Sequence, residues 1–340
     1  MTTHKVLTTN SNNLSEIDDK SIDLVVTSPP YPMIEMWDAI WGSNIDDILK
    51  TGNGYKAFIN MHNMLNDVWK ECDRVLKDGG FVCINIGDAT RTINNKFQLY
   101  PNHAKIIEFF SSIGYSVLPD IHWHKQSNAP NKFMGSGMYP AGAYVTYEHE
   151  YILIFRKGNK RTFQRQEKYL RQKSAYFWEE RNIWFSDLWN IKGTMQRMSG
   201  ASKIVRNRNA SFPLEIPYRL INMYSIEGDT VLDPFFGLGT TGIASIISNR
   251  NSIGVEIDSG IAELALEAMN VTPDYCNQYI ESRLSRHIEF INSLPDDKKT
   301  KLYQNIPHGF DVKTRQETLI YIEKLKSIKR IGNKYVCEYQ

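Results

Sequence analysis

A glycine-rich turn between an apolar run and a helical pattern constrains the fold of this chain more than any other feature. Residues 230–233 predict a short buried strand, and the pattern from Thr240 to Ser248 predicts a helix. Between them, Gly237 and Gly239 allow the backbone to approach a ligand closely, and the helix would offer free N–H groups. This succession is typical of open α/β sheets that bind a ligand at the carboxyl ends of their strands.

Strand and helix patterns alternate along most of the chain. This alternation predicts an α/β fold with a doubly wound parallel sheet and helices on both faces. Residues 156–208 interrupt the alternation, which indicates an insertion, and residues 271–340 predict a helical C-terminal extension. The expected strands are 21–27, 81–86, 115–123, 150–155 and 252–256. The expected helices are 61–76, 104–113 and 217–224. The chain is expected to divide into four parts, at residues 1–155, 156–208, 209–270 and 271–340.

The glycine-rich turn carries an acid, Asp233, and lacks the third glycine of the dinucleotide fingerprint. A pyrophosphate would be repelled by Asp233, whereas a ligand bearing a sulfonium and an ammonium would be attracted. Glu256 ends the next predicted strand, where an acid typically accepts hydrogen bonds from ribose hydroxyls. These features favour S-adenosyl-L-methionine over a nicotinamide dinucleotide, although an ordinary turn capped by an acid has the same pattern.

Ser28-Pro29-Pro30-Tyr31 follows the predicted strand 21–27. Two prolines remove two N–H donors and leave carbonyls free to face a ligand. The Ser28 hydroxyl and the Pro29 carbonyl could accept both hydrogens of an exocyclic base amine, whose lone pair would then face a methyl donor. Tyr31 would stack on a base that has left the duplex. The plain alternative is a proline-rich exit from a strand.

Charge and cysteine usage narrow the class of protein. The net charge is only +2, but residues 156–208 hold 14 Lys and Arg against 4 Asp and Glu, a local excess typical of a segment that binds a polyanion. The four cysteines form no CxxC pair, and the pair His122 and His124 has no accompanying ligand cluster, so we expect neither a metal site nor a disulfide framework. No apolar run predicts a membrane span or a secretory signal, and we expect a cytoplasmic protein.

Taken together, these motifs show that the chain resembles the amino-methylating DNA methyltransferases of restriction–modification systems, in the permuted, beta-type order with the catalytic block first. The resemblance covers roughly residues 5–270. It implies a Rossmann-like class I methyltransferase sheet, S-adenosyl-L-methionine as cofactor and double-stranded DNA as partner. It also implies a prokaryotic, nucleoid-associated location and allows a cognate restriction endonuclease as a further partner. The residues it implies for catalysis are Ser28, Pro29, Pro30 and Tyr31, and those for the cofactor are Asn10, Phe212, Pro213, Asp233, Phe235, Gly237, Gly239, Thr240 and Glu256.

Target recognition in this family lies between the two blocks, where the basic segment falls. Candidates for DNA contact are Trp123, Lys125, Arg197, Lys203, Arg206 and Arg208. Residues 85–88 end a further strand at the same sheet edge, and we interpret them as a capped turn rather than as direct contacts.

The choice of base depends on the resemblance alone. The serine form of the tetrapeptide is associated in this family with N4 methylation of cytosine, and the aspartate form with N6 methylation of adenine. Both bases present an amine to the same acceptors, so the physical argument does not separate them. Our hypothesis is an N4-cytosine enzyme, and the alternatives are an N6-adenine enzyme and a nucleic-acid-binding protein without catalysis. C5-cytosine chemistry is excluded because no cysteine follows a proline or lies in the candidate loops.

Overall fold

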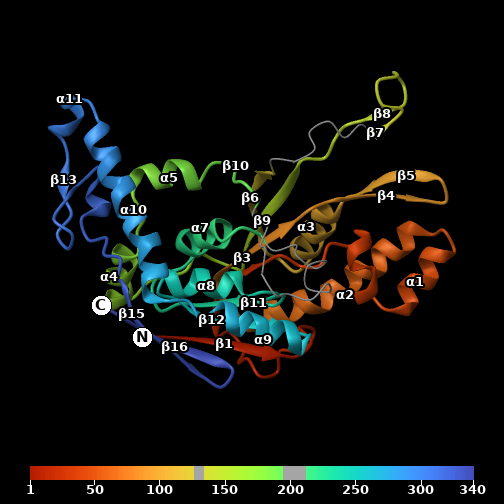
Figure 1. Ribbon diagram of the computed structural model, residues 1–340, viewed down its shortest axis with the longest axis horizontal. Coiled ribbons are helices and arrows are strands. Elements are labelled where there is room, and N and C mark those ends of the chain that lie inside the picture. Colours follow the sequence, from red (N-terminus) through yellow and green to blue (C-terminus); the bar gives the residue numbers. More distant parts are fainter. Residues whose placement is uncertain (126–133, 194–211) are drawn as a thin grey trace.

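A ten-stranded sheet forms the centre of the computed structural model, which describes residues 1–125, 134–193 and 212–340 (Figure 1). In order across the sheet, its strands are β10 (Leu188–Asn190), β6 (Ser116–His124), β9 (His149–Arg156), β3 (Leu76–Ile86), β2 (Ile22–Thr27), β11 (Thr230–Asp233), β12 (Asn251–Glu256), β1 (Thr2–Thr8), β16 (Lys334–Tyr339) and β15 (Leu325–Ile331). The expectation of a wholly parallel sheet needs a correction, because β9 and β16 run antiparallel to both of their neighbours.

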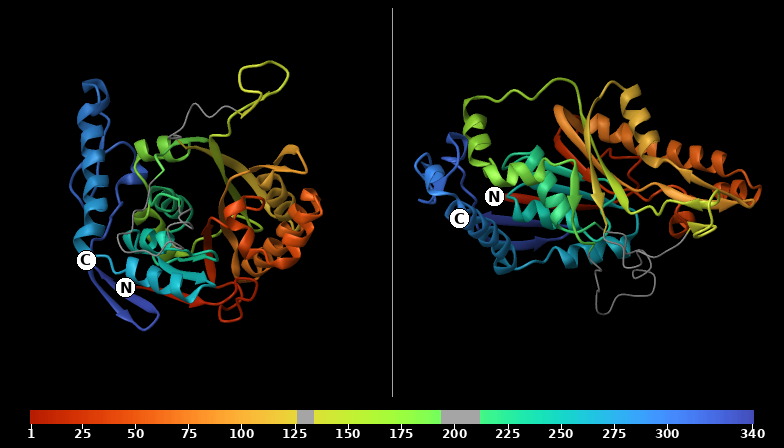
Figure 2. Two further views of the ribbon diagram at one scale, coloured as in Figure 1. Left: turned by 45° about the vertical axis from the view of Figure 1, so that its right-hand side comes forward. Right: turned by 90° about the horizontal axis from the view of Figure 1, so that it is seen from above.

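Helices cover both faces of the sheet (Figure 2). On one face pack α1 (Ser43–Lys50), α2 (Gly54–Val75) and α3 (Asn102–Ser112). On the other pack α7 (Glu215–Tyr224), α8 (Thr240–Ile247), α9 (Ser259–Ala268) and α10 (Pro273–Ser293). Successive residues of β2 point to opposite faces of the sheet. Val25 belongs to the core under α1, α2 and α3, whereas Leu24 and Val26 belong to the second core, under α7 to α10. A strand buried on both faces accounts for the continuous apolar run in the sequence.

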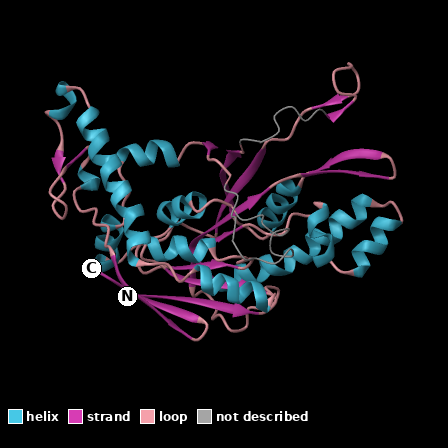
Figure 3. Cartoon of the chain, viewed as in Figure 1, coloured by secondary structure: helices cyan, strands magenta, loops and turns pink. Residues whose placement is uncertain are grey.

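Shorter elements complete the described chain. They are η1 (Glu35–Ile40), α4 (Arg165–Lys173), α5 (Trp178–Trp184), α11 (Asp296–Lys299), η2 (Arg315–Glu317) and the strand pair β13 (Tyr303–Gln304) and β14 (Asp311–Val312). Two hairpins project from the body, β4 (Ala89–Ile93) with β5 (Lys96–Tyr100) and β7 (Met134–Gly135) with β8 (Ala143–Tyr144) (Figure 3). Phe97 and Tyr144 stack between the two hairpins, with ring centroids 4.7 Å apart.

The predicted strands and helices of the two main blocks agree with the structure, but two boundaries were wrong. The helix expected at 61–76 begins seven residues earlier, at Gly54. Residues 77–80 were expected to separate a helix from a strand, whereas they lie inside β3. The register with β2 shifts at this point, and Gly79 adopts a φ of +85°. A glycine in a strand often marks such an irregularity rather than a loop.

Residues 156–193, the described part of the predicted insertion, pack onto the sheet. β10 pairs in parallel with β6 and adds an edge strand. Trp189 of β10 is buried in the second core. Lys173 forms an ion pair with Glu227 at 2.7 Å, so part of the segment's positive charge is used within the fold.

The expectation of a helical C-terminal extension is correct for α10 and wrong for the last residues. β15 and β16 form a hairpin, and β16 pairs antiparallel with β1. Tyr335 and Cys337 are buried, with the period of two typical of a strand covered on one face. The hairpin covers an edge that β1 would otherwise expose, and it brings the two termini close together (Figure 2). Among the described residues, no helix is long and apolar enough to cross a membrane.

Candidate active site

The sheet changes its direction of winding between β2 and β11, and a cavity opens beside that point. From β2 the chain crosses to β3, whereas from β11 it crosses to β12 on the other side. Ligands in open α/β sheets bind at such a point, beyond the carboxyl ends of the strands. The cavity has a volume of about 330 Å³ and is lined by residues that follow β1, β2, β11 and β12. The two predicted blocks, far apart in the sequence, therefore meet at one site.

Most of the predicted site residues line this cavity: Asn10, Ser28, Pro29, Pro30, Tyr31, Phe212, Asp233, Phe235, Gly237, Thr240 and Glu256. Gly239 and Pro213 do not line it. Gly239 adopts a φ of +81° at the start of α8, a conformation that favours glycine and shapes the turn. The carbonyl of Pro213 accepts the N–H of Ile216 at 2.9 Å as α7 begins.

Asp233 lies at the end of β11, only 3% exposed. Its carboxylate accepts hydrogen bonds from the hydroxyls of Thr27 and Thr241, each at 2.6 Å, and from the N–H of Phe235 at 3.1 Å. Burial raises the pKa of Asp233 to about 6, because the hydrogen bonds only partly offset the loss of solvent. Asp233 is therefore mostly charged at neutral pH, and a nearby cation would favour that charge.

Glu256 ends β12 beside the same turn. One carboxylate oxygen accepts from the N–H of Gly237 at 3.1 Å, and the other accepts from the N–H of Asp258 at 3.0 Å. Burial raises the pKa of Glu256, an effect that these backbone hydrogen bonds oppose. The loop after β1 adjoins it, because the N–H of Thr9 donates to the carbonyl of Glu256 at 3.2 Å. This contact places Asn10 next to Glu256 at the cavity.

An apolar wall of the cavity was not predicted from the sequence. It is built from η1 and α2 and consists of Trp37, Ile40, Trp41, Met64, Leu65 and Val68. Apolar residues of α2 recur at helical spacing along one stripe, and of these Leu65 and Val68 also belong to the core. Periodicity alone could not show that the end of this stripe reaches a ligand site.

The two motifs are joined directly at the sheet edge. Thr27 is the residue before Ser28, and its hydroxyl donates to Asp233 at 2.6 Å. Because β2 and β11 are neighbouring parallel strands, this bond fixes the start of the tetrapeptide against the start of the glycine-rich turn. The arrangement holds a hydroxyl, a free carbonyl and an aromatic ring beside an acidic turn.

Behind the tetrapeptide lies a hydrogen-bonded network. The hydroxyl of Tyr31 lies 3.1 Å from the hydroxyl of Ser28 and donates to Glu150 at 2.8 Å. The side-chain amide of Asn85 donates to Tyr31 at 2.8 Å and to Glu150 at 2.7 Å. Lys125 forms an ion pair with Glu150. Asn85 and Glu150 lie on β3 and β9, so the network ties two more strands to the site.

Tyr31 keeps its proton in this setting. Burial, together with the charge of Glu150, raises the pKa of Tyr31 well above its ordinary value. A Cβ on Gly87 would lie 3.0 Å from the tyrosine ring, so the glycine makes room for it. The interpretation of residues 85–88 as a capped turn needs a correction, because Asn85 and Ile86 lie in β3 and the Asp88 carboxylate accepts from the N–H of His103 as α3 begins. It missed Asn85, which contacts the tetrapeptide.

The candidates for DNA contact have different outcomes. Trp123 is 1% exposed, and its indole N–H donates to the carbonyl of Ile191 at 2.8 Å, so it is a core residue and we no longer assign it to DNA. Lys125 is partly exposed and lies over the Trp123 ring at 4.6 Å. The remaining candidates, Arg197, Lys203, Arg206 and Arg208, lie outside the described residues.

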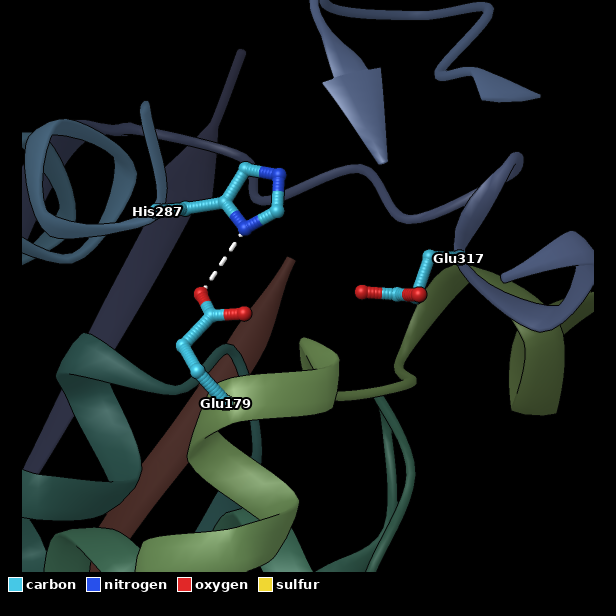
Figure 4. Close-up of side chains that lie close together, drawn as sticks. All are labelled: Glu179, His287 and Glu317. Atoms are coloured by element: carbon cyan, nitrogen blue, oxygen red, sulfur yellow. Dashed lines mark hydrogen bonds and ion pairs between the residues drawn. The ribbon is translucent and has the colours of Figure 1, made fainter. Parts of the chain in front are cut away.

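A cluster of ligand-type side chains lies away from the cavity (Figure 4). Within the described residues, atoms of Glu179, His287 and Glu317 lie within 4.8 Å of one another. Hydrogen bonds account for their approach: Nδ1 of His287 lies 2.8 Å from Glu179, and its Nε2–H donates to the carbonyl of Asp311 at 3.0 Å. Glu317 accepts the N–H of Trp178 at 2.8 Å. These contacts join α5 to α10 and η2.

The comparisons with known proteins identify the family. A family model described as DNA methylase, covering N6 and N4 methyltransferases, matches residues 22–267. The chain belongs to this family. It is 51% identical over 338 residues to the type II methyltransferase M.MthZI of Methanothermobacter thermautotrophicus, an alignment that covers 98% of this chain and 93% of that protein. It is 48% identical to the type II methyltransferase M.MjaI of Methanocaldococcus jannaschii, covering 86% and 97%.

Solved structures agree with this membership. A putative DNA modification methylase from Thermus thermophilus, complexed with S-adenosyl-L-methionine, is 31% identical, with a TM-score of 0.61 over 78% of this chain and 93% of that one. The PvuII DNA methyltransferase (cytosine-N4-specific) has a TM-score of 0.53 over 84% and 94%; at 18% identity it shows the fold alone. This DNA amino-methyltransferase thus has the expected Rossmann-like fold and uses S-adenosyl-L-methionine.

Proposed function

We propose that this methyltransferase transfers a methyl group to the N4 amine of cytosine in duplex DNA, after the base has been extruded from the helix. The observation that carries the proposal is the position of Ser28, at the cavity and joined through Thr27 to the turn at Asp233. The serine form of the tetrapeptide supports cytosine as the target, since this form is associated with N4 methylation in the family.

The cavity suits the cofactor. Asp233 and Glu256 would provide negative charge and hydrogen-bond acceptors for a ligand that carries a sulfonium, an ammonium and ribose hydroxyls. The apolar wall, which includes Trp41, would hold its adenine together with Phe235 of the glycine-rich turn. S-adenosyl-L-methionine supplies an electrophilic methyl group when bound.

The tetrapeptide would prepare the nucleophile. An exocyclic amine is a poor nucleophile because its lone pair is delocalised into the ring. If the Ser28 hydroxyl and the Pro29 carbonyl accept its two hydrogens, the nitrogen moves towards tetrahedral geometry and its lone pair is freed. Positioning and preorganised acceptors then provide the catalysis, with no covalent intermediate on the protein. Tyr31, at the cavity, would stack on the extruded base.

Duplex DNA would be bound by the basic segment and by side chains near the cavity mouth. We propose that residues 156–208 provide target recognition, because their charge excess suits a phosphate backbone. Two relatives are named type II methyltransferases, which supports a place in a restriction–modification system and a cognate endonuclease as a partner in the cell.

The test identifies the base. Purified protein is incubated with unmodified bacterial genomic DNA and methyl-labelled cofactor, the DNA is digested to nucleosides, and the labelled nucleoside is identified by mass. N4-methylcytosine is the expected product, and N6-methyladenine would overturn the choice of base. A Ser28→Ala protein serves as the control for contaminating activity, since it should bind cofactor but produce little label.

A further inference from the structure

A buried hydrogen-bond chain behind the tetrapeptide has a defined direction. It starts at Ser28, passes through Tyr31 and ends at Glu150, which is 8% exposed. Asn85 and Lys125 also bind Glu150. Neither Asn85 nor Glu150 lines the cavity, so they would act on a substrate only through the tetrapeptide.

The chemistry of each group fixes where the protons point. A carboxylate can only accept hydrogen bonds, and the two N–H bonds of an amide nitrogen can only donate. The 2.8 Å bond between Tyr31 and Glu150 therefore uses the single proton of the phenol. Because the only proton of the phenol is used in that hydrogen bond, the phenol oxygen can only accept from Ser28, 3.1 Å away. The hydroxyl proton of Ser28 is thus directed at Tyr31, and its lone pairs are left as acceptors. The Asn85 amide makes a long contact of 3.4 Å with this oxygen, which leaves acceptor capacity for the amine.

This direction matters for an amine substrate. A serine hydroxyl is both donor and acceptor, and it rotates to suit its neighbours. If its proton faced the cavity, it would compete for the nitrogen lone pair that must attack the methyl group. We propose that Glu150 is a positioning residue which, through the Tyr31 hydroxyl, holds Ser28 in the acceptor orientation required by the amine. This inference rests on the proposed function and applies equally to a cytosine or an adenine amine.

The competing explanation is a structural one. Glu150 also joins β9 to Asn85 of β3 and to Lys125 after β6, so its loss could simply loosen the sheet edge. The two explanations differ at Tyr31. Tyr31→Phe removes the phenol link between Ser28 and Glu150 but leaves the ring and the contacts of Glu150 with Asn85 and Lys125 in place. The 3.4 Å contact of the Asn85 amide with Ser28 also stays, and it cannot replace the phenol because an amide N–H does not accept the serine proton.

A double-mutant cycle separates the two explanations. The variants are Tyr31→Phe, Glu150→Leu, which leaves no acceptor for the Tyr31 proton, and the double variant. The measurement is the single-turnover rate of methyl transfer to unmodified genomic DNA with saturating cofactor. Each single variant should lower the rate about tenfold, the size of one hydrogen bond. The double variant should fall no more than about twofold below the single ones, because both changes break the same chain. The Kd for S-adenosyl-L-methionine should stay within about twofold of the wild-type value.

Glu148→Leu is the matched control. Glu148 is two positions from Glu150, its side chain is 37% exposed, and its carboxylate lies 4.0 Å from Nε2 of His124. Its removal should leave the rate unchanged. If Glu150→Leu does not fold, Glu150→Asp takes its place in the cycle, since it keeps the charge for Lys125 but shortens the reach to Tyr31.

The outcomes are separable. Losses that multiply in the double variant, an unchanged rate in Glu150→Leu, or a rate loss matched by an equal loss of cofactor affinity would each overturn the positioning role. A wild-type protein that methylates adenine would overturn only the choice of cytosine, and the cycle would still be informative. A wild-type protein that labels no DNA would overturn the proposed function before any variant is compared.

Discussion

Asp233→Asn should stabilise the protein without cofactor and weaken cofactor binding. In the folded chain, burial raises the pKa of this carboxyl from 3.8 to about 6. At about 1.4 kcal/mol for each pH unit, the ionised form costs about 3 kcal/mol of folding free energy at pH 8. Asparagine has nearly the same shape and carries no charge. It keeps an oxygen for Thr27 and Phe235, while its NH₂ group replaces the acceptor for Thr241.

The sign of the pH dependence follows from the raised pKa. A folded-state pKa above the unfolded one gives stability that is fully present below about pH 4 and is lost as the pH rises through about 6. Asp233→Asn removes this loss. The lost hydrogen bond costs about 1 kcal/mol, so the variant should be more stable than wild type by about 1–2 kcal/mol at pH 8 and no more stable at pH 4.

Urea unfolding of the cofactor-free proteins at several pH values measures this difference, and calorimetric titration with S-adenosyl-L-methionine measures the Kd. We expect the Kd to rise about tenfold or more in the variant, because the carboxylate no longer faces the cationic ligand. A stability difference that is independent of pH, or an unchanged Kd, would refute the electrostatic role given to Asp233.

Three further predictions test other parts of the site and the fold. Ser28→Ala should lower kcat about 10- to 100-fold while the Kd for the cofactor stays the same; a matching rise in that Kd would contradict its role as an acceptor for the amine. Glu256→Gln should raise the Kd for S-adenosyl-L-methionine about tenfold and leave the rate at saturating cofactor nearly unchanged, as judged by titration and single turnover. For His287, burial lowers the pKa but the hydrogen bond and charge of Glu179 raise it more, so the net pKa lies above 6.5. The stabilisation from this ion pair is present below pH 6.5 and is lost as the pH rises through the folded pKa. His287→Gln should therefore flatten the fall in unfolding free energy above pH 6.5, and an equal fall in both proteins would be the contrary result.

Local sequence signals were sufficient to predict an element where the residues that form the pattern also form the resulting strand or turn. The strand 22–27 carries the apolar run 24–26 because both of its faces are buried. The turn after Asp233 needs glycine because Gly239 adopts a positive φ. Motifs of this kind predicted the cavity, since parallel strands deliver their carboxyl ends to one edge.

The parts that sequence reasoning missed depend on contacts between distant segments. In the sequence, residues 325–339 resemble a charged, irregular tail. In the fold they form a hairpin that covers the edge of the sheet at β1. Glu150 precedes an apolar run and resembles the polar start of any strand, and only the fold brings it to Tyr31. Trp123 shows the opposite error. The resemblance to the family suggested that its segment contacts DNA, whereas Trp123 is buried where β10 pairs with β6.

The central claim is that the acceptors at Ser28 and Pro29, beside the turn at Asp233, select the exocyclic amine of a base for methylation. Mass analysis of nucleosides from DNA labelled by the wild-type protein tests it most directly. We predict N4-methylcytosine, with the label lost in Ser28→Ala. Label on carbon 5 of cytosine, or label that survives Ser28→Ala undiminished, would contradict the account.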